Sequence, residues 1–423
     1  MSTAALAALN LTVAALAAVP SSAAPAAVTA AADVTAPAGF VGMSPTRVLD
    51  TRDYNQVPEF RTARPLQEGQ YFTTPIATFC RSHPPRDCTS VVPTDVTSVV
   101  VNVTVTNPTA DSYLSLGPTA GAPGTRPATS SINFKAGQTV SNLVTVAVGP
   151  VSRAAPWLTV YNNAGTADVV LDVVGYYRTA ATDKYGPLTP TRIADSRSDG
   201  TGRLGGDAVR TYQVARPELG TADAKAVVLN VTTTDGSWDS FVTAYPSGTQ
   251  RPANGSNVNF PVGSTVANQV VVPVGADGKI DIYNRAGWVH VIVDVVGYYG
   301  PSGTGLFSAL TTPVRNLDTR ITGGKLQRGA TTAVRAVPAD GSVPNVLGVA
   351  ANVTVTDVTD SGHLTVFPGG GQPPNTSTVN VEPGQTVANS VTTGVTGGGT
   401  YSVFNHGGPV NVVADLTGYF VTG

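Results

Sequence analysis

The chain has few charged side chains and few residues of the types that bind metal ions. Asp, Glu, Lys and Arg make up 12% of its 423 residues, and the formal net charge is −2. An average soluble domain is charged at roughly 25% of its positions. Nucleic-acid-binding domains carry a basic stripe, so this composition argues against a nucleic-acid partner. The four His and two Cys show no metal-ligand spacing, so we expect neither a metal nor a cofactor.

Long apolar runs are also scarce, whereas turn-forming residues are abundant. With 45 Gly and 32 Pro, the chain favours short strands and turns over long helices. One apolar run, residues 4–19, is followed by small residues at 20–24, a pattern typical of a signal peptide although no Lys or Arg precedes it. No second run is long enough to span a membrane. We therefore predict a secreted or cell-surface protein, with residues 1–38 as a signal-like, Ala-rich leader and linker.

Four short motifs recur three times in the same order. PTRVLDTR at 45–52 returns as PTRIADSR at 190–197 and as PVRNLDTR at 313–320. The other motifs are NVT at 102, 230 and 352, GQTVSN or a close variant at 137, 263 and 384, and DVVGY or DLTGY at 172, 294 and 415. Such recurrence is the signature of tandem modules. The closing motifs are 122 and 121 residues apart, which is long enough for each module to have its own core.

The spacing predicts modules at residues 39–178, 183–300 and 305–423. Because the segments that join them are short, we expect the modules to touch one another. A rigid rod and a compact pseudo-threefold cluster both satisfy this condition, and the sequence leaves the two open.

The local pattern within each module has period two. Val101, Val103 and Val105 alternate with Asn102 and Thr104, as in a strand with two unlike faces. About seven to nine such runs occur in each module, separated by Gly- and Pro-rich turns, and none of the runs reads as an amphipathic helix. We therefore predict an all-β fold of three tandem antiparallel β-sandwich modules, immunoglobulin-like or jelly-roll-like. A β-prism or barrel-like closure of each module is the alternative.

Recurring Asp and Arg residues are the strongest candidates for a site. Asp172 lies inside an apolar strand, and a buried carboxylate needs a partner. Arg47, Asp50 and Arg52 recur in step with it, so we predict a structural cluster in which a guanidinium holds the closing strand through the aspartate. The alternative is a catalytic pair, Asp50 with Asp172, for glycan hydrolysis. The full predicted set is Arg47, Asp50, Arg52 and Asp172; Arg192, Asp195, Arg197 and Asp294; and Arg315, Asp318, Arg320 and Asp415.

Other recurring residues have local interpretations. Asn102, Asn142 and Asn162, with their counterparts, are expected to bond to the backbone at strand ends or turns. The glycine of the closing motif, Gly175 in the first copy, indicates a bulge or a close backbone approach.

Two further features are not shared between the modules. Cys80 and Cys88 lie in an insertion of the first module and are expected to form a local disulfide in an exported protein. Trp238 and Trp288 belong to the second module and are candidates for stacking on sugar rings; packing in a core or loop is the other interpretation.

Taken together, the motifs resemble a module of secreted actinobacterial cell-surface proteins that reads P-x-R-L-L-D-T-R, N-V-T, G-Q-T-V-x-N and D-V-x-G-Y-F. The resemblance covers residues 39–423 and implies location and architecture, because the family carries no assigned activity. The second copy departs from the pattern at Ala194 and Ser196, and the third departs at Asn316, but both keep the Asp and the second Arg.

These observations favour a non-enzymatic surface protein that binds a polysaccharide, a cell-wall polymer or a protein partner. A structural spacer or self-assembling subunit is the second hypothesis, and a glycan hydrolase that uses acidic residues is the third.

Overall fold

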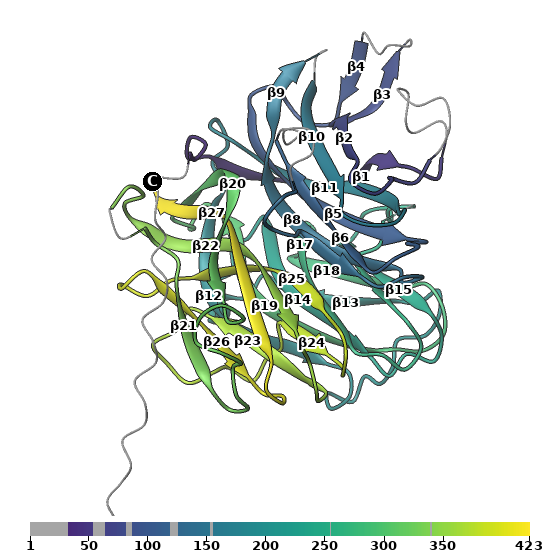
Figure 1. Ribbon diagram of the computed structural model, residues 1–423, viewed down its shortest axis with the longest axis vertical. Coiled ribbons are helices and arrows are strands. Elements are labelled where there is room, and N and C mark those ends of the chain that lie inside the picture. The colour runs from purple at the N-terminus through teal and green to yellow at the C-terminus, as the bar shows by residue number, and fades with distance from the viewer. Residues whose placement is uncertain are drawn as a thin grey trace, which may run out of the picture.

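A computed structural model describes residues 33–53, 64–81, 87–118, 126–152, 155–253, 255–338 and 341–423. Within these ranges the chain forms 27 β-strands and one 3₁₀ turn, η2 (Pro217–Leu219) (Figure 1). The all-β class predicted from the period-two pattern is therefore confirmed. Residues 1–32 of the predicted leader lie outside the described residues, so the signal peptide stays a prediction.

The strands follow the sequence repeats. The first repeat contains β1 (Gly39–Asp50), β2 (Tyr71–Pro75), β3 (Ala77–Arg81), β4 (Asp87–Ser90), β5 (Val96–Thr106), β6 (Ser112–Gly117), β7 (Ile132–Phe134), β8 (Val140–Ala147), β9 (Gly149–Ser152), β10 (Ala155–Asn162) and β11 (Asp168–Arg178). The second contains β12 (Lys184–Asp195), β13 (Val209–Gln213), β14 (Ala226–Thr234), β15 (Ser240–Pro246), β16 (Val258–Phe260), β17 (Val266–Pro273), β18 (Lys279–Asn284) and β19 (His290–Gly300). The third contains β20 (Gly305–Asp318), β21 (Thr331–Arg335), β22 (Val346–Thr356), β23 (Gly362–Phe367), β24 (Val379–Val381), β25 (Val387–Gly394), β26 (Thr400–Asn405) and β27 (Asn411–Thr422).

Each repeat pairs its strands into two antiparallel sheets with the same order. In the second repeat one sheet runs β12-β19-β14-β17 and the other runs β13-β18-β15-β16, and the first and third repeats match this order. Numbered along the repeat, strands 1, 8, 3 and 6 form one sheet and strands 2, 7, 4 and 5 form the other. This is the strand order of a jelly roll. Of the two sandwich types predicted, each repeat therefore has the jelly-roll one.

The two sheets of a repeat differ in what covers them. We call the sheet that contains the first and last strands the inner sheet and the other the outer sheet. On β5 of the inner sheet, Val101 and Val103 face the core of their own repeat. Val100, Asn102 and Thr104 alternate with them and point the other way, yet all three are also buried. Both faces of the inner sheet are covered because the neighbouring repeats pack against its second face.

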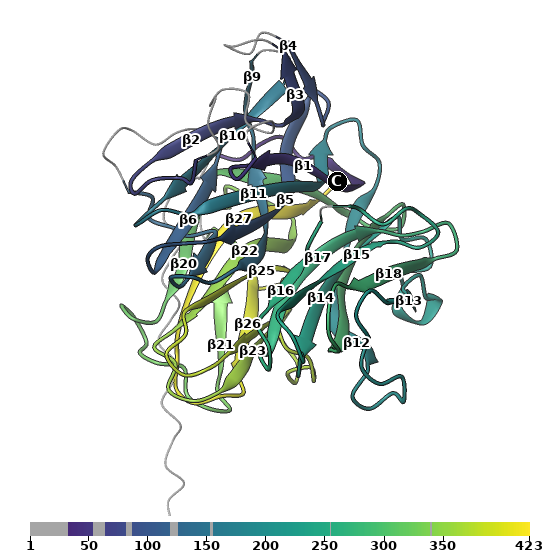
Figure 2. The same cartoon turned by 90° about the vertical axis from the view of Figure 1, so that its right-hand side faces the viewer.

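The three repeats surround a central cluster of aromatic side chains. Figure 2 shows them as three lobes, with the first at the top, the second at the lower right and the third at the lower left. Each repeat contributes one aromatic ring from its first strand and one from its last, and all six are at most 2% exposed. The first-strand ring of each repeat lies on the last-strand ring of the next. The three pairs are Phe40 with Tyr299, Tyr185 with Phe420 and Phe307 with Tyr177, with ring centroids 4.0, 4.1 and 4.5 Å apart.

This cyclic stacking decides between the two arrangements that the sequence left open, because the third repeat returns to contact the first. The backbone follows the same order: Tyr185 of β12 pairs with Gly305 of β20 and joins two inner sheets into one of eight strands. Residues 33–38, which the sequence assigned to a linker, pair instead with the third repeat through bridges from Val34 and Ala38 to β20. The repeats form a pseudo-threefold cluster.

The closing-motif glycine makes this packing sterically feasible. A shift in register occurs between Val173 and Gly175, as expected for a bulge. A Cβ atom at Gly175 would overlap the ring of Phe40, and one at Gly297 would overlap the ring of Tyr185. The first-strand aromatic of each repeat therefore lies flat over a position where only hydrogen fits, which confirms the expected close approach.

Candidate functional site

The four residues predicted as a cluster lie together in the first repeat. We call them, with their counterparts, the Arg–Asp cluster. Arg47 Nε donates to Asp172 Oδ1 at 2.9 Å and a terminal amino group of Arg47 donates to Oδ2 at 3.2 Å, while the other terminal group reaches Asp50 at 3.1 Å. Arg52 holds Asp50 from the far side with two bonds of 2.8 and 2.7 Å. The first strand of the repeat is thereby joined to its last strand by charge-assisted bonds.

The other two repeats reproduce this geometry. Arg192 binds Asp294 at 2.8 and 3.2 Å, and Arg315 binds Asp415 at the same two distances. The closing aspartates are almost fully buried, with the Asp294 side chain 0% exposed. The structure thus brings all twelve predicted residues together in three sets; the second and third are Arg192, Asp195, Arg197 and Asp294, and Arg315, Asp318, Arg320 and Asp415.

Burial and ion pairing act in opposite directions on these carboxyls. Burial raises the pKa of Asp172, Asp294 and Asp415 above the usual aspartate value, against the bonds from their arginines. The hydrogen bond from Arg197 lowers the pKa of Asp195, and that from Arg320 lowers the pKa of Asp318. Within each set, the pKa is raised for the more deeply buried aspartate and lowered for the aspartate nearer the solvent.

A recurring asparagine stands beside each cluster and bonds to the next repeat. Asn102 lies opposite Asp172 in the sheet, as Arg47 does from the other side, so the three form a row across three strands. The side-chain amide of each such asparagine donates to the carbonyl of a serine in the following repeat. The pairs are Asn102 with Ser256 at 2.6 Å, Asn230 with Ser377, and Asn352 with Ser130 at 2.7 Å.

Two of these serines, Ser377 and Ser130, also contact the closing aspartates. The backbone N–H of Ser377 donates to Asp294, and that of Ser130 donates to Asp415. Arg315 also donates to the carbonyl of Ala128 in the first repeat at 2.8 Å. The row of Arg, Asp and Asn is therefore a docking site for the backbone of the adjacent repeat, a role that the sequence interpretation of the cluster as an internal link did not include.

A second set of asparagines also crosses between the repeats. The Oδ1 atoms of Asn142, Asn268 and Asn389 accept bonds from backbone N–H groups of the preceding repeat. The donors are Ser390 to Asn142 at 2.9 Å, Leu143 to Asn268 at 3.4 Å and Gln269 to Asn389 at 3.1 Å. The predicted bonds to the backbone are also present within each repeat, because the side-chain amides donate to carbonyls of Ser131, Asn257 and Thr378 at 2.7, 2.6 and 2.6 Å. The contacts with the preceding repeat are additional and were not predicted. Asn162 behaves as predicted and bonds to the carbonyls of Leu66 and Gly165 in its own turn region.

The two candidate tryptophans lie side by side on loops at one end of the second repeat. Trp238 follows β14 and is 67% exposed, and Trp288 follows β18 and is 60% exposed. Ser237 joins their loops, because its N–H donates to the Trp288 carbonyl at 2.9 Å and its hydroxyl accepts from the Trp288 N–H at 2.8 Å. Val262, 59% exposed, lies on a third loop that bonds to the first through Asp239 at 2.7 Å.

We call Trp238, Val262 and Trp288 the tryptophan patch. Ala110 and Asp360 stand at the positions equivalent to Trp238 in the other repeats. A common scaffold therefore presents a different loop surface in each repeat. The sequence identified both tryptophans but gave no sign that two loops separated by about 50 residues would place them together.

The backbone brings the two cysteines into register. Cys80 of β3 stands opposite Cys88 of β4 in a two-stranded sheet. Their side chains are outside the described part of the structure, so the disulfide stays a prediction.

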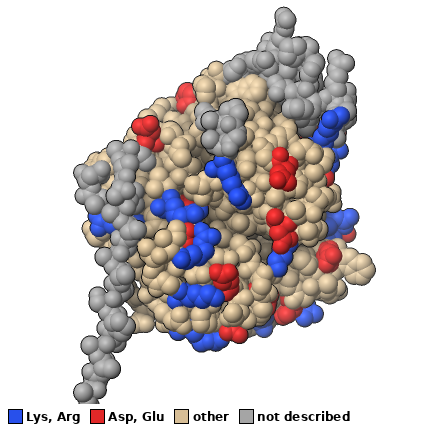
Figure 3. All heavy atoms as spheres, viewed as in Figure 1, with Lys and Arg blue, Asp and Glu red and all other residues tan. Residues whose placement is uncertain are grey.

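Charge and metal-ligand chemistry are sparse over the described surface. On the face in Figure 3, basic and acidic residues are interspersed and most of the surface is uncharged. Among the described residues, no three His, Cys, Asp or Glu side chains are grouped so that they could hold a metal ion. Nor does any helix within these ranges have the length and apolar character needed to cross a membrane.

Comparison with known proteins adds little to this geometry. No protein-family model matches the chain, and no curated protein matches it. One similar solved structure is described as "The Triple Jelly Roll Fold and Turret Assembly in an Archaeal Virus"; it is 8% identical, over 90% of this chain and 91% of that chain, with a TM-score of 0.16. Another, "Life in the extremes: atomic structure of Sulfolobus Turreted Icosahedral Virus", is 8% identical over 92% and 100%, also with a TM-score of 0.16. Likeness at this level carries no argument about fold or function.

Proposed function

We propose that the chain is an exported, non-enzymatic binding protein of the cell surface or extracellular matrix, and that its ligand is a polysaccharide or cell-wall polymer. The observation that carries this proposal is the tryptophan patch. Two large rings exposed by 67% and 60% stand on adjacent loops of a jelly roll, and exposed aromatic groups that cluster in this way mark a contact surface.

The chemistry of the patch suits a sugar polymer. The apolar C–H face of a pyranose ring stacks on an indole ring, while its hydroxyl groups stay in water or bond to the nearby loops. The hydrogen bonds through Ser237 hold the two loops together before any ligand arrives. Pre-organisation of this kind reduces the entropy lost on binding.

The Arg–Asp clusters support a non-enzymatic role. Hydrolysis of a glycosidic bond needs two carboxyl groups that reach the substrate. Asp172 and its counterparts are buried, bonded bidentately to arginine and, in the second and third repeats, bonded to the backbone of the next repeat. Their surroundings are those of structural ion pairs.

The test is a pull-down of the full chain on insoluble polysaccharides and purified actinobacterial cell walls. We expect saturable binding to one polymer, and replacement of Trp238 and Trp288 by Ala should weaken it about tenfold or more. Ile321→Ala is the matched control, because Ile321 is 79% exposed and lies on the third repeat.

Two results would overturn the proposal. Equal binding by wild type and the double tryptophan variant would remove the patch from the interaction. Absence of binding to every polymer, together with concentration-dependent assembly of the protein, would favour a self-assembling structural subunit.

A further inference from the structure

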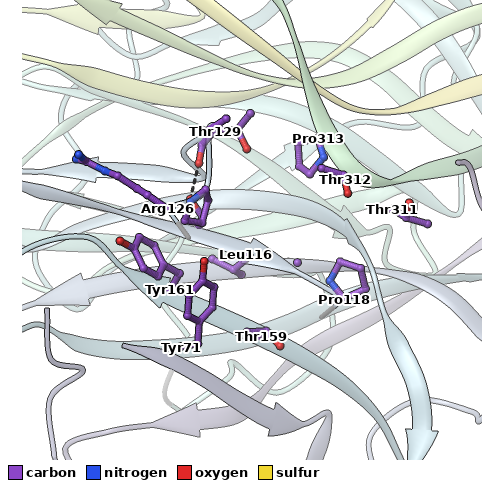
Figure 4. A pocket seen from close by; sticks show the side chains of 14 residues that line it. Tyr71, Leu116, Pro118, Arg126, Thr129, Thr159, Tyr161, Thr311, Thr312 and Pro313 are labelled. Carbon is purple, nitrogen blue, oxygen red and sulfur yellow. Dashed lines mark hydrogen bonds between the residues drawn. The ribbon is translucent and has the colours of Figure 1, made fainter. Parts of the chain in front are cut away.

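A pocket lies between the first and third repeats. It encloses about 220 Å³ against the outer sheet of the first repeat and is closed on one side by β20 of the third. Figure 4 shows Tyr71 and Tyr161 next to each other at one end and Thr312 and Pro313 at the other, with Arg126 extending beyond Tyr161. The volume is smaller than the roughly 300–1,000 Å³ of sites for drug-sized ligands, so the pocket fits a single ring.

The two tyrosines form an aromatic wall because of the strand register. Tyr71 of β2 stands directly opposite Tyr161 of β10, and their ring centroids are 4.7 Å apart at an angle of 43°. Tyr113 of the neighbouring β6 lies 6.4 Å from Tyr161. Each ring keeps its neighbours in place, so the wall is rigid without a ligand.

Arg126 supplies a positive charge beside this wall. Its side chain is exposed, and its Nε donates to the Tyr113 hydroxyl at 3.0 Å. The guanidinium carbon is 5.6 Å from the centre of the Tyr113 ring. The structure shows no hydrogen bond from the two terminal amino groups to any described residue, and a guanidinium presents such groups to a carboxylate as a matched pair of donors.

The polar lining of the pocket has unused hydrogen-bonding groups. The hydroxyls of Tyr161, Thr129 and Thr312 form no hydrogen bond with another described residue, and all three residues line the pocket. Hydroxyl groups accept as well as donate, so they match the hydroxyls of a sugar.

The second repeat lacks this pair of tyrosines. There Val209 occupies the position of Tyr71, opposite Tyr283. Arg251, from a loop that matches the Arg126 loop in sequence, lies with its guanidinium carbon 4.0 Å from the centre of the Tyr283 ring. The guanidinium of Arg251 thus lies over the ring of Tyr283, whereas Arg126 lies over Tyr113 and not over Tyr161, the counterpart of Tyr283.

We infer that this pocket binds one acidic pyranose unit, a hexuronate residue of a polysaccharide. The sugar ring would stack on Tyr71 and Tyr161, its hydroxyls would bond to the threonines, and its carboxylate would pair with Arg126. The inference deepens the proposed function by naming an acidic sugar, but it uses a different site from the tryptophan patch and does not depend on it.

The experiment titrates the full chain with glucuronate and galacturonate, and with glucose and galactose as neutral counterparts, and follows the tyrosine signals by NMR. We expect at least one uronate to bind about tenfold more tightly than its neutral sugar, with weaker binding as salt is added. Arg126→Gln should abolish this preference, and Tyr71→Ala should weaken both sugars. Arg251→Gln is the matched control and should leave the titration unchanged.

The outcomes separate this inference from the proposed function. Equal affinity for uronates and neutral sugars, or no binding of either, would overturn the acidic-sugar site even if the tryptophan patch binds a polymer. Binding of a proline-rich peptide, but of neither sugar, would assign the tyrosine wall to peptide recognition instead and also overturn it. The double tryptophan variant should keep the uronate site intact whether or not it binds insoluble polysaccharide.

Discussion

Phe307 in the third repeat packs against Tyr177 in the first, with ring centroids 4.5 Å apart and the ring planes at 32°. This contact completes a cycle of three equivalent aromatic pairs. Each repeat contacts both of its neighbours through one aromatic side chain for each. Tyr177 and Tyr299 add a buried hydrogen bond between their hydroxyls at 2.5 Å. Burial raises the pKa of both tyrosines, so the phenols stay neutral and the bond is uncharged.

Replacing Phe307 by Ala should destabilise more than the repeat that contains it. Loss of a buried phenylalanine costs about 3–5 kcal/mol, and here it also removes the partner of Tyr177. Hydrogen exchange should show reduced protection in β11 of the first repeat as well as in β27 of the third. Protection lost in the third repeat alone would mean that the repeats are energetically independent.

Asp294→Asn should lower the free energy of unfolding by about 3 kcal/mol or more, because Arg192 would lose its bidentate partner in a mostly buried site and keep only the longer, 3.4 Å contact with Asp195. Urea unfolding measures the change. Asp277→Asn is the control, since the Asp277–Lys279 pair is exposed by 46% and 40% and such pairs contribute about 0–1 kcal/mol. Equal effects of the two variants would contradict a buried structural ion pair.

Gly297→Ala should also destabilise the protein, by about 1–3 kcal/mol, because the added methyl group overlaps the ring of Tyr185 and forces the central cluster to shift. Gly371→Ala provides the comparison, as no atom lies within 4 Å of the new methyl group there. Thermal melting of the two variants side by side tests the difference. A Gly297→Ala protein with the melting temperature of wild type would show that the central cluster accommodates the methyl group.

Stability should fall as the pH is lowered from about 6.5 to about 4. Burial, followed by the charge of His406 at a ring distance of 4.0 Å, lowers the pKa of His363 from 6.5 to about 4. The unfolded chain therefore binds a proton in this window that the folded chain does not, which reduces the free energy of unfolding by about 3 kcal/mol at the acid end.

His363→Tyr should remove most of this pH dependence, and Tyr113 occupies the equivalent place in the first repeat. The difference between the two proteins is the quantity to measure by urea unfolding at several pH values. The buried aspartates with raised pKa, such as Asp294, act in the opposite direction and are common to both proteins. Parallel pH profiles would rule out the histidine as the cause.

A pairing of Asp294 with Arg192 or Arg197 could be predicted because it follows from two local facts, and the structure shows that Arg192 is the partner. A carboxylate inside an apolar strand needs a counter-charge, and each repeat supplies arginines in the motif at its start. The bond from Asn230 to Ser377 could not be predicted in the same way. An asparagine in a strand has many backbone partners within reach, and nothing local indicates that its partner lies in another repeat.

The sequence by itself determined the strands, the three repeats and the ion pair that joins the first strand of each repeat to its last. The alternation of side chains along a strand indicates which residues share a face, and turn residues indicate where the strand ends. Only the tertiary structure decided what covers the second face. On β5, Val101 and Val103 lie on one face and Val100 and Asn102 on the other. This pattern fits an inner sheet whose second face contacts either water or protein. The neighbouring repeats bury that face. Long-range contacts such as that of Phe307 with Tyr177 hold the repeats in place, and no local sequence pattern specifies these contacts.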